Sequence, residues 1–168
     1  MSLVPKCQII YKGDVLAGAF YLLVGTVLLI FAIVLDYINL SLGYHYLSIG
    51  FFIFFLYCIG KGLLMIFINY KRYKFYKSLT FFTSIMKSDE IEYTEYRIQK
   101  KQTNRRRYTW TLVLGCLFAF LGIFSSEKGL IMGTTIPIAL IAGIEFGVGL
   151  LTEFRLREFL RILKKNTD

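Results

Sequence analysis

Lys61 and Glu145 are the side chains whose type and position first indicate chemistry, because each lies inside an apolar run. Lys61 lies in CIGKGLL (residues 58–64) and Glu145 in AGIEFGVG (residues 142–149). A charge in the middle of a bilayer costs about 2.5–3.5 kcal/mol on insertion scales, so it is rare and generally has a specific role. Lys61 precedes the end of its run, near Asn69, by about eight residues, and Glu145 precedes Leu151 by six. At about 1.5 Å per residue the two depths differ by about 3 Å. The sequence therefore predicts an intramembrane ion pair, solvated by the phenol of Tyr57.

Two other interpretations of these charges remain open from the sequence alone. Each side chain could extend separately to the inner interface, with the Glu145 carboxyl ionised or protonated there. A water-filled polar cavity is the other alternative, because Thr134 and Thr135 precede Glu145 in the same run and would begin a line of polar atoms. The two hydroxyls could equally bond to carbonyls freed by Pro137, which is a purely structural role.

Small residues lie next to Glu145. Ala139, Gly143 and Gly147 are spaced by four and share one helix face. Small residues let a neighbouring helix approach closely in a membrane. We expect this face to pack against a second helix, which belongs either to the same chain or to another copy in a homo-oligomer.

Four apolar runs must position these residues, at about 15–35, 47–69, 109–124 and 129–151. A membrane-spanning helix needs about 20 mostly apolar residues, and the third run is the shortest. The 168-residue chain is 56% hydrophobic and only 18% charged, which is typical of membrane proteins rather than soluble ones. The predicted fold is an all-α integral membrane protein with four transmembrane helices in two helical hairpins.

Lys and Arg residues predict the orientation of these helices. Of the 20 basic residues, eighteen lie before the first run, in residues 70–107 or in the tail 152–168, whereas only Lys128 lies in a loop on the other side. By the positive-inside rule, both termini and residues 70–107 are cytoplasmic, and the expected location is the cell (inner) membrane. The expected basic cytoplasmic surface consists of Lys71, Arg72, Lys74, Lys77, Arg105, Arg106, Arg107, Arg155, Arg157 and Arg161.

Residues 70–107 predict a helical hairpin that extends the second and third spans. Apolar residues recur there at helical spacing, and Ser88 would cap a second helix with an acidic first turn, DEIE (residues 89–92). We expect these acidic side chains to be solvated. A β-hairpin over residues 80–100 is the alternative, because Ile91 and Tyr93 alternate with charged residues.

The tail 152–168 predicts a basic amphipathic helix. Leu156, Phe159, Leu160 and Leu163 lie on one face, with arginines around the rest of the helix. Such a helix, placed directly after a span, is expected to lie on an anionic inner leaflet.

The sequence offers little for catalysis. It has one histidine and three cysteines without CxxC spacing, and no nucleophile–base pair or phosphate-binding loop. We therefore predict no catalytic residue, no metal site and no cofactor, and expect the protein not to be an enzyme. Nucleic-acid binding is also disfavoured, because no recognition motif accompanies the basic charge.

The predicted function is that of an accessory or scaffold protein. Its basic loop and tail would dock anionic lipid headgroups or a cytoplasmic protein partner. A small oligomeric channel or transporter that uses Lys61, Glu145, Thr134 and Thr135 is the alternative. The layout of four spans with a long basic cytoplasmic segment also resembles accessory proteins found beside bacterial antiviral systems. That resemblance of layout implies a membrane-perturbing or accessory role in antiviral defence.

Overall fold

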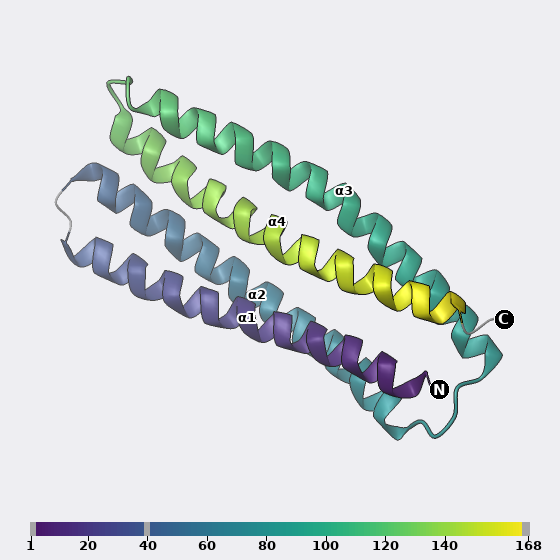
Figure 1. Cartoon of the computed structure of the whole chain (residues 1–168). Helices are drawn as coiled ribbons and strands as arrows, with labels where there is room; N and C mark the ends of the chain where they lie inside the picture. Colours follow the sequence, from purple (N-terminus) through teal and green to yellow (C-terminus); the bar gives the residue numbers. More distant parts are fainter. Residues whose placement is uncertain (1–2, 39–40, 166–168) are drawn as a thin grey trace.

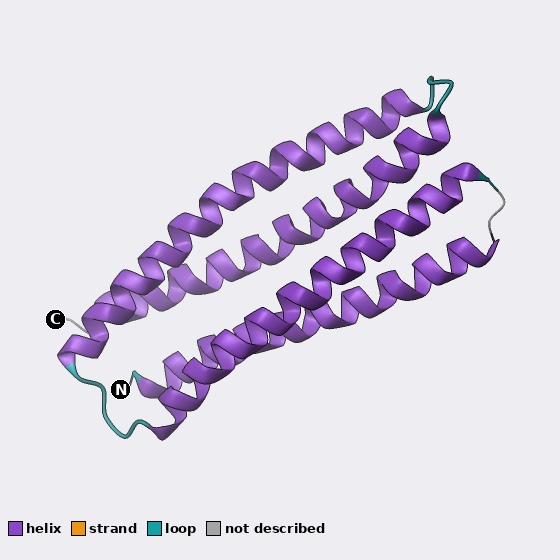
Figure 2. Cartoon of the chain, turned by 180° about the vertical axis from the view of Figure 1, so that it is seen from behind, coloured by secondary structure: helices purple, strands orange, loops and turns teal. Residues whose placement is uncertain are grey.

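The computed structural model describes residues 3–38 and 41–165, which form four long helices and the loops between them. The helices are α1 (Val4–Ile38), α2 (Leu42–Ser78), α3 (Ser84–Gly122) and α4 (Lys128–Lys165) (Figure 1). They form two antiparallel hairpins, α1–α2 and α3–α4, joined mainly through α2 and α4 (Figure 2). Both ends of the chain lie at the same end of the bundle as the connection 79–83 (Figure 1). We call this the basic end.

The helices are much longer than a membrane is thick. They contain between 35 and 39 residues, or about 52–58 Å, against a hydrocarbon core of about 30 Å. Three of them, α1, α2 and α4, are long and apolar enough to cross a membrane. Helix α3 does not meet this test, because only its last part, from about residue 109, is apolar. The all-helical prediction is confirmed, and three of the four expected helices have the length and composition of spans.

The segment 70–107 is a helical hairpin, so the β-hairpin alternative for residues 80–100 is wrong. Helix α2 continues to Ser78 and α3 begins at Ser84. The side chain of Thr83 caps α3 by accepting a hydrogen bond of 3.4 Å from the Met86 amide. Ser88 therefore lies inside the helix, and its predicted capping role is wrong by about one turn. Leu79 and Phe82 lie in the connection between α2 and α3, where their side chains pack on the core at the basic end.

That core explains why the tail is helical. Cys7 and Tyr11 of α1 and Tyr76 of α2 pack against Phe159 and Leu163 of α4. Helix α4 continues unbroken from its apolar run to Lys165. The apolar face of the tail therefore differs from the expectation, because it covers the protein's own core rather than the surface of a leaflet.

Small residues bring the helices of each hairpin together. A Cβ atom at Gly62 of α2 would lie 2.9 Å from the Gly18 carbonyl oxygen of α1, so this contact requires glycine. In the other hairpin, a Cβ at Gly115 would lie 3.1 Å from the Ala139 Cβ atom. The predicted face of α4 is thus divided between two neighbours. Ala139 and Gly143 face α3, whereas Gly147 lies in a groove beside α1.

Candidate anion-binding pocket beside a buried ion pair

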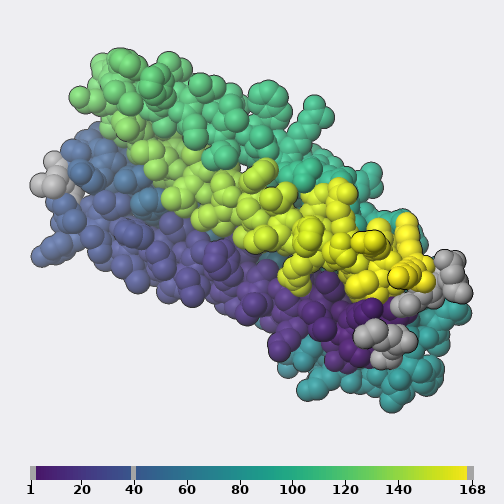
Figure 3. Space-filling view, viewed as in Figure 1, coloured from purple at the N-terminus to yellow at the C-terminus, as the bar shows by residue number. Residues whose placement is uncertain are grey.

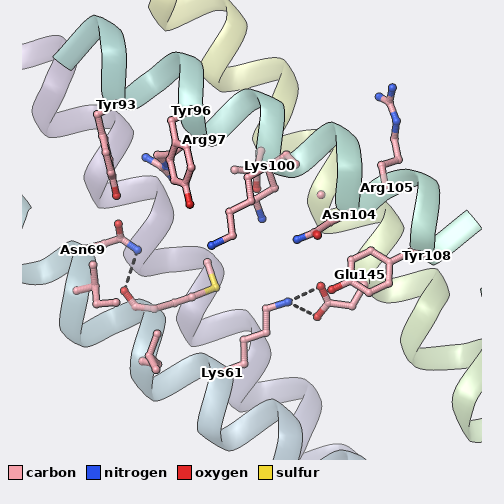
Figure 4. A pocket seen from close by; sticks show the side chains of 16 residues that line it. Lys61, Asn69, Tyr93, Tyr96, Arg97, Lys100, Asn104, Arg105, Tyr108 and Glu145 are labelled. Carbon is pink, nitrogen blue, oxygen red and sulfur yellow. Dashed lines mark hydrogen bonds and ion pairs between the residues drawn. The ribbon is translucent and has the colours of Figure 1, made fainter. Parts of the chain in front are cut away.

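The structure brings Lys61 of α2 onto Glu145 of α4 within one chain. The Lys61 ammonium donates to both carboxylate oxygens of Glu145 (Figure 4). The Tyr57 hydroxyl donates to Glu145 Oε1 at 3.0 Å and accepts from Lys61 Nζ at 3.3 Å. The Lys61 ammonium also lies 4.6 Å from the centre of the Tyr21 ring, which adds a cation–π contact from α1.

Burial makes this pair a structural link between the two hairpins. The Glu145 side chain is 4% exposed and that of Lys61 is 23% exposed. A buried carboxylate without a partner is strongly destabilising, so α2 and α4 are held in the register that lets the ammonium reach it. This geometry matches the ion-pair interpretation, since the two side chains lie against each other rather than extending separately to an interface.

Thr134 and Thr135 lie apart from this pair. The Thr134 hydroxyl donates to the carbonyls of Leu130 and Ile131, and the Thr135 hydroxyl donates to that of Ile131. None of these carbonyls is the one that Pro137 leaves without its helical donor, which belongs to Gly133. Between Thr135 and Glu145 the chain reads IPIALIAGI, which has no polar side chain. The threonines thus bond within their own helix, and α4 does not continue a polar path from them to Glu145.

A cavity lined by both polar and apolar side chains adjoins the ion pair on the side of the basic end. Its volume is about 270 Å³, and it lies between α2, α3 and α4. Figure 4 shows Lys100 and Asn104 projecting from α3 into the space above Lys61. The polar side chains that line the cavity are Lys61, Asn69, Tyr93, Tyr96, Arg97, Lys100, Lys101, Asn104, Arg105, Tyr108, Glu145 and Thr152.

Three of the five cations in this lining are neutralised by carboxylates. Lys61 pairs with Glu145, as described above. The Arg97 guanidinium pairs with Asp14 of α1 at 2.6 Å. Arg105 extends away from the cavity (Figure 4) and pairs with Glu153 of α4 at 2.8 Å.

The other two cations, Lys100 and Lys101, make no ion pair within residues 3–38 and 41–165. Lys100 lies 5.8 Å from the centre of the Tyr96 ring, which is a weak contact for an ammonium. Burial lowers the pKa of Lys101 from its ordinary value, and the positive charge of Lys61 lowers it further. An anion in the cavity would oppose both effects. The pocket therefore has two ammonium groups without an ion-pair partner among the described residues, beside amide side chains that can donate hydrogen bonds.

Sequence reasoning missed a set of buried carboxylates at the basic end. Asp14, Glu90 and Glu153 are each at most 4% exposed, although Glu90 was expected to be solvated. Glu90 accepts hydrogen bonds from the hydroxyls of Tyr11 at 2.5 Å and Tyr76 at 2.7 Å. Most of their partners lie on other helices, so no short sequence pattern marks those contacts; the exception is Arg157, which follows Glu153 by four residues on α4. The sequence signal available for them is the excess of arginine at the basic end, where a few carboxylates would be expected to pair with it.

The residues of the predicted basic surface fall into two groups, those with contacts inside the bundle and those that are exposed. Four of its arginines make internal contacts: Arg72 with Tyr11, Arg105 and Arg157 with Glu153, and Arg155 with the Ile10 carbonyl. The remaining six residues are exposed, namely Lys71, Lys74, Lys77, Arg106, Arg107 and Arg161. Part of the basic charge thus stabilises the bundle, and the rest is available at its surface.

The arrangement is suited to holding an anion by charge and hydrogen bonds. Among the described residues, no group of three or more His, Cys, Asp and Glu side chains is placed to hold a metal ion. Comparisons of this chain with known protein families, with curated proteins and with solved structures found no match.

Proposed function

We propose that this chain is a non-catalytic, four-span inner-membrane scaffold that binds an anionic phospholipid headgroup of the cytoplasmic leaflet in the pocket beside Lys61. The observation that carries the proposal is the charge of the pocket. Three of its cations have carboxylate partners, whereas Lys100 and Lys101 line the cavity without one among the residues that the structure describes. A phosphate group would supply the missing negative charge.

The packing of α3 on α4 supports a fourth span. Gly115 of α3 lies against Ala139 of α4, and a Cβ at Gly122 would lie 2.8 Å from the Ile131 side chain. The apolar end of α3 therefore runs beside the apolar run of α4. If α4 crosses the bilayer, this part of α3 is at the same depth. Its outward side chains are apolar and exposed, as a lipid-facing surface requires: Trp110, Leu114, Leu117, Phe118 and Leu121.

The proposed orientation places the pocket at the headgroup layer. Eighteen of the 20 basic residues lie at the basic end, which the positive-inside rule assigns to the cytoplasm. The lining extends from Lys61 and Glu145, inside the predicted spans, to Arg97 and Lys100 in the segment 70–107. A lipid phosphate at the inner interface would thus lie level with the cavity.

Buried ion pairs and hydrogen bonds join the helices of the bundle beyond the proposed membrane region. Asp14 of α1 and Glu153 of α4 each pair with an arginine of α3, and Glu90 of α3 bonds to tyrosines of α1 and α2. These contacts fasten the cytoplasmic segment to the other helices. The six exposed cations would then be presented in fixed positions to the leaflet.

Lipid titration of two charge-matched variants tests the proposal. Lys100→Gln/Lys101→Gln removes the two unpaired pocket cations, and Lys74→Gln/Lys77→Gln removes two exposed cations elsewhere on the cytoplasmic segment. The binding of phosphatidylglycerol to detergent-solubilised protein is measured by native mass spectrometry, with phosphatidylcholine as the zwitterionic reference.

The pocket variant is expected to bind the anionic lipid about thirtyfold more weakly, because it loses two direct ammonium–phosphate contacts of about 1 kcal/mol each. The control variant should bind like the wild type. Equal binding by the pocket variant and the wild type, or an equal loss in both variants, would show that the pocket does not select the headgroup.

A further inference from the structure

A second cavity lies on the other side of α4, between α4 and α1. These helices lie side by side on the face seen in Figure 3. The cavity is an open groove of about 750 Å³ with mostly apolar walls, which include Ala17, Phe20 and Leu23 of α1 and Ile144 and Gly147 of α4. It is separate from the ion pair and from Lys100 and Lys101.

Gly147 forms an open part of this groove. A Cβ atom added there would meet nothing within 4 Å, whereas one at Gly18 or Gly62 would meet the neighbouring helix at 3.0 Å or less. Gly147 therefore does not bring two helices of this chain together. It leaves space beside α1 that another molecule can occupy.

The groove has the length of one membrane leaflet. Along α1 its lining extends from Gly13 to Leu23, which is eleven residues joined by ten rises. At about 1.5 Å per residue this is about 15 Å, half of a hydrocarbon core of about 30 Å. The groove thus extends from the basic end to the middle of the bilayer in the proposed threading.

Arg155 lies at the basic end of the groove. Its guanidinium donates to the Ile10 carbonyl at 3.0 Å and makes no ion pair with any described residue, unlike Arg97, Arg105 and Arg157. Gly13 makes room for it, because a Cβ there would lie 1.9 Å from the guanidinium. A guanidinium has five N–H donors, so most remain free for a phosphate.

We infer that the groove binds one phospholipid of the cytoplasmic leaflet, with an acyl chain along Gly147 and the phosphate on Arg155. An apolar channel one leaflet long with a cation at its headgroup end matches the two parts of this molecule. This site rests on the membrane threading of the proposed function, but not on the lipid selectivity of the pocket. A second copy of the chain could also cover an apolar groove, and the experiment distinguishes the two occupants.

The test uses full-length protein in vesicles of phosphatidylcholine and phosphatidylglycerol with a trace of phosphatidylglycerol that carries a photoreactive acyl chain. Gly147→Phe fills the groove. Gly60→Phe is the matched control, because a Cβ at Gly60 of α2 also meets nothing within 4 Å. Arg155→Gln removes the cation at the end of the groove and leaves the apolar walls unchanged. Cross-linked peptides are quantified by mass spectrometry, and melting curves check that each variant is folded.

The wild type is expected to cross-link at residues 16–23 of α1 and 144–151 of α4. Gly147→Phe should lower this labelling at least fivefold, Arg155→Gln at least threefold, and Gly60→Phe not at all. Lys100→Gln/Lys101→Gln should keep the cross-link, which separates this site from the pocket. Unchanged labelling in folded Gly147→Phe and Arg155→Gln would overturn the inference. So would a dimer in detergent that Gly147→Phe converts to a monomer, because the occupant would then be a second copy.

Discussion

Replacing Lys61 by methionine tests the role of the ion pair in holding the hairpins together. The change leaves the Glu145 carboxyl, in a side chain that is 4% exposed, without its ammonium partner, although the Tyr57 hydroxyl still donates to it. Removing one partner of a buried ion pair generally costs about 3–5 kcal/mol. Because Lys61 itself is 23% exposed, we expect the lower end of this range. For a chain of this length, a loss of about 3 kcal/mol lowers the melting temperature by about 6–12 °C.

The double variant Lys61→Met/Glu145→Leu makes the prediction specific. Apolar side chains of similar size can replace a buried ion pair with little loss, or even with a gain. We therefore expect the double variant to melt within about 4 °C of the wild type, which corresponds to a change in unfolding free energy of about 1–2 kcal/mol. Lys71→Met on the same helix is the control, because the Lys71 side chain is exposed.

Thermal unfolding in a mild detergent, followed by circular dichroism, measures all four proteins under one condition. The reasoning would be refuted if the melting temperature of Lys61→Met equalled those of Lys71→Met and the wild type. It would also be refuted if the double variant were as unstable as the single one, since the loss would then reflect Lys61 packing rather than an unpaired carboxyl.

Three further predictions concern other contacts of the bundle. Asp14→Asn should lower stability by about 3 kcal/mol and speed tryptic cleavage of α3, measured by limited proteolysis, because Asp14 is 1% exposed and holds Arg97. Burial and Glu90 raise the pKa values of Tyr11 and Tyr76 above the usual value of about 10, so stability should be complete below about pH 10 and fall above it. A Tyr11→Phe/Tyr76→Phe variant should lose less of its melting temperature between pH 9 and 11.5, and an equal loss would contradict this assignment. Gly62→Leu should destabilise by at least about 1–3 kcal/mol through overpacking against α1, whereas Gly60→Leu should melt like the wild type, because Gly60 has open space where Gly62 meets the Gly18 carbonyl.

Features that depend on helix geometry could be predicted from the sequence. The contact between Lys61 and Glu145 follows from the rise per residue and from the similar distance of each residue to the basic boundary that ends its run. The helical hairpin follows from the spacing of apolar residues over 70–107. The position of its turn does not, because Thr83 and Ser88 are both good caps. Leu79 and Phe82 decide it by packing on the Cys7 and Tyr76 core, which is a tertiary contact.

The buried charges could not be predicted in the same way. Arg97 and Asp14 are 83 residues apart in sequence, and Arg105 and Glu153 are 48 apart. The distribution of Lys and Arg indicates which side of a membrane they occupy, but not which of them meet a carboxylate on another helix. That Lys100 and Lys101 make no ion pair with a described residue can be recognised only after the carboxylate partners of Arg97 and Arg105 are known. The pocket therefore required the placement of α3 beside α2 and α4, together with the Arg97–Asp14 pair that joins α3 to α1.

The side of the membrane on which the basic end lies is the central claim, and single-cysteine labelling measures it directly. In a variant whose three native cysteines are replaced by alanine, Lys74→Cys and Lys128→Cys are introduced separately and exposed to a membrane-impermeant maleimide. Lys74→Cys should be labelled only after the cells are permeabilised, whereas Lys128→Cys should be labelled in intact cells. Labelling of Lys74→Cys in intact cells, with Lys128→Cys protected, would contradict the orientation and the lipid sites that depend on it.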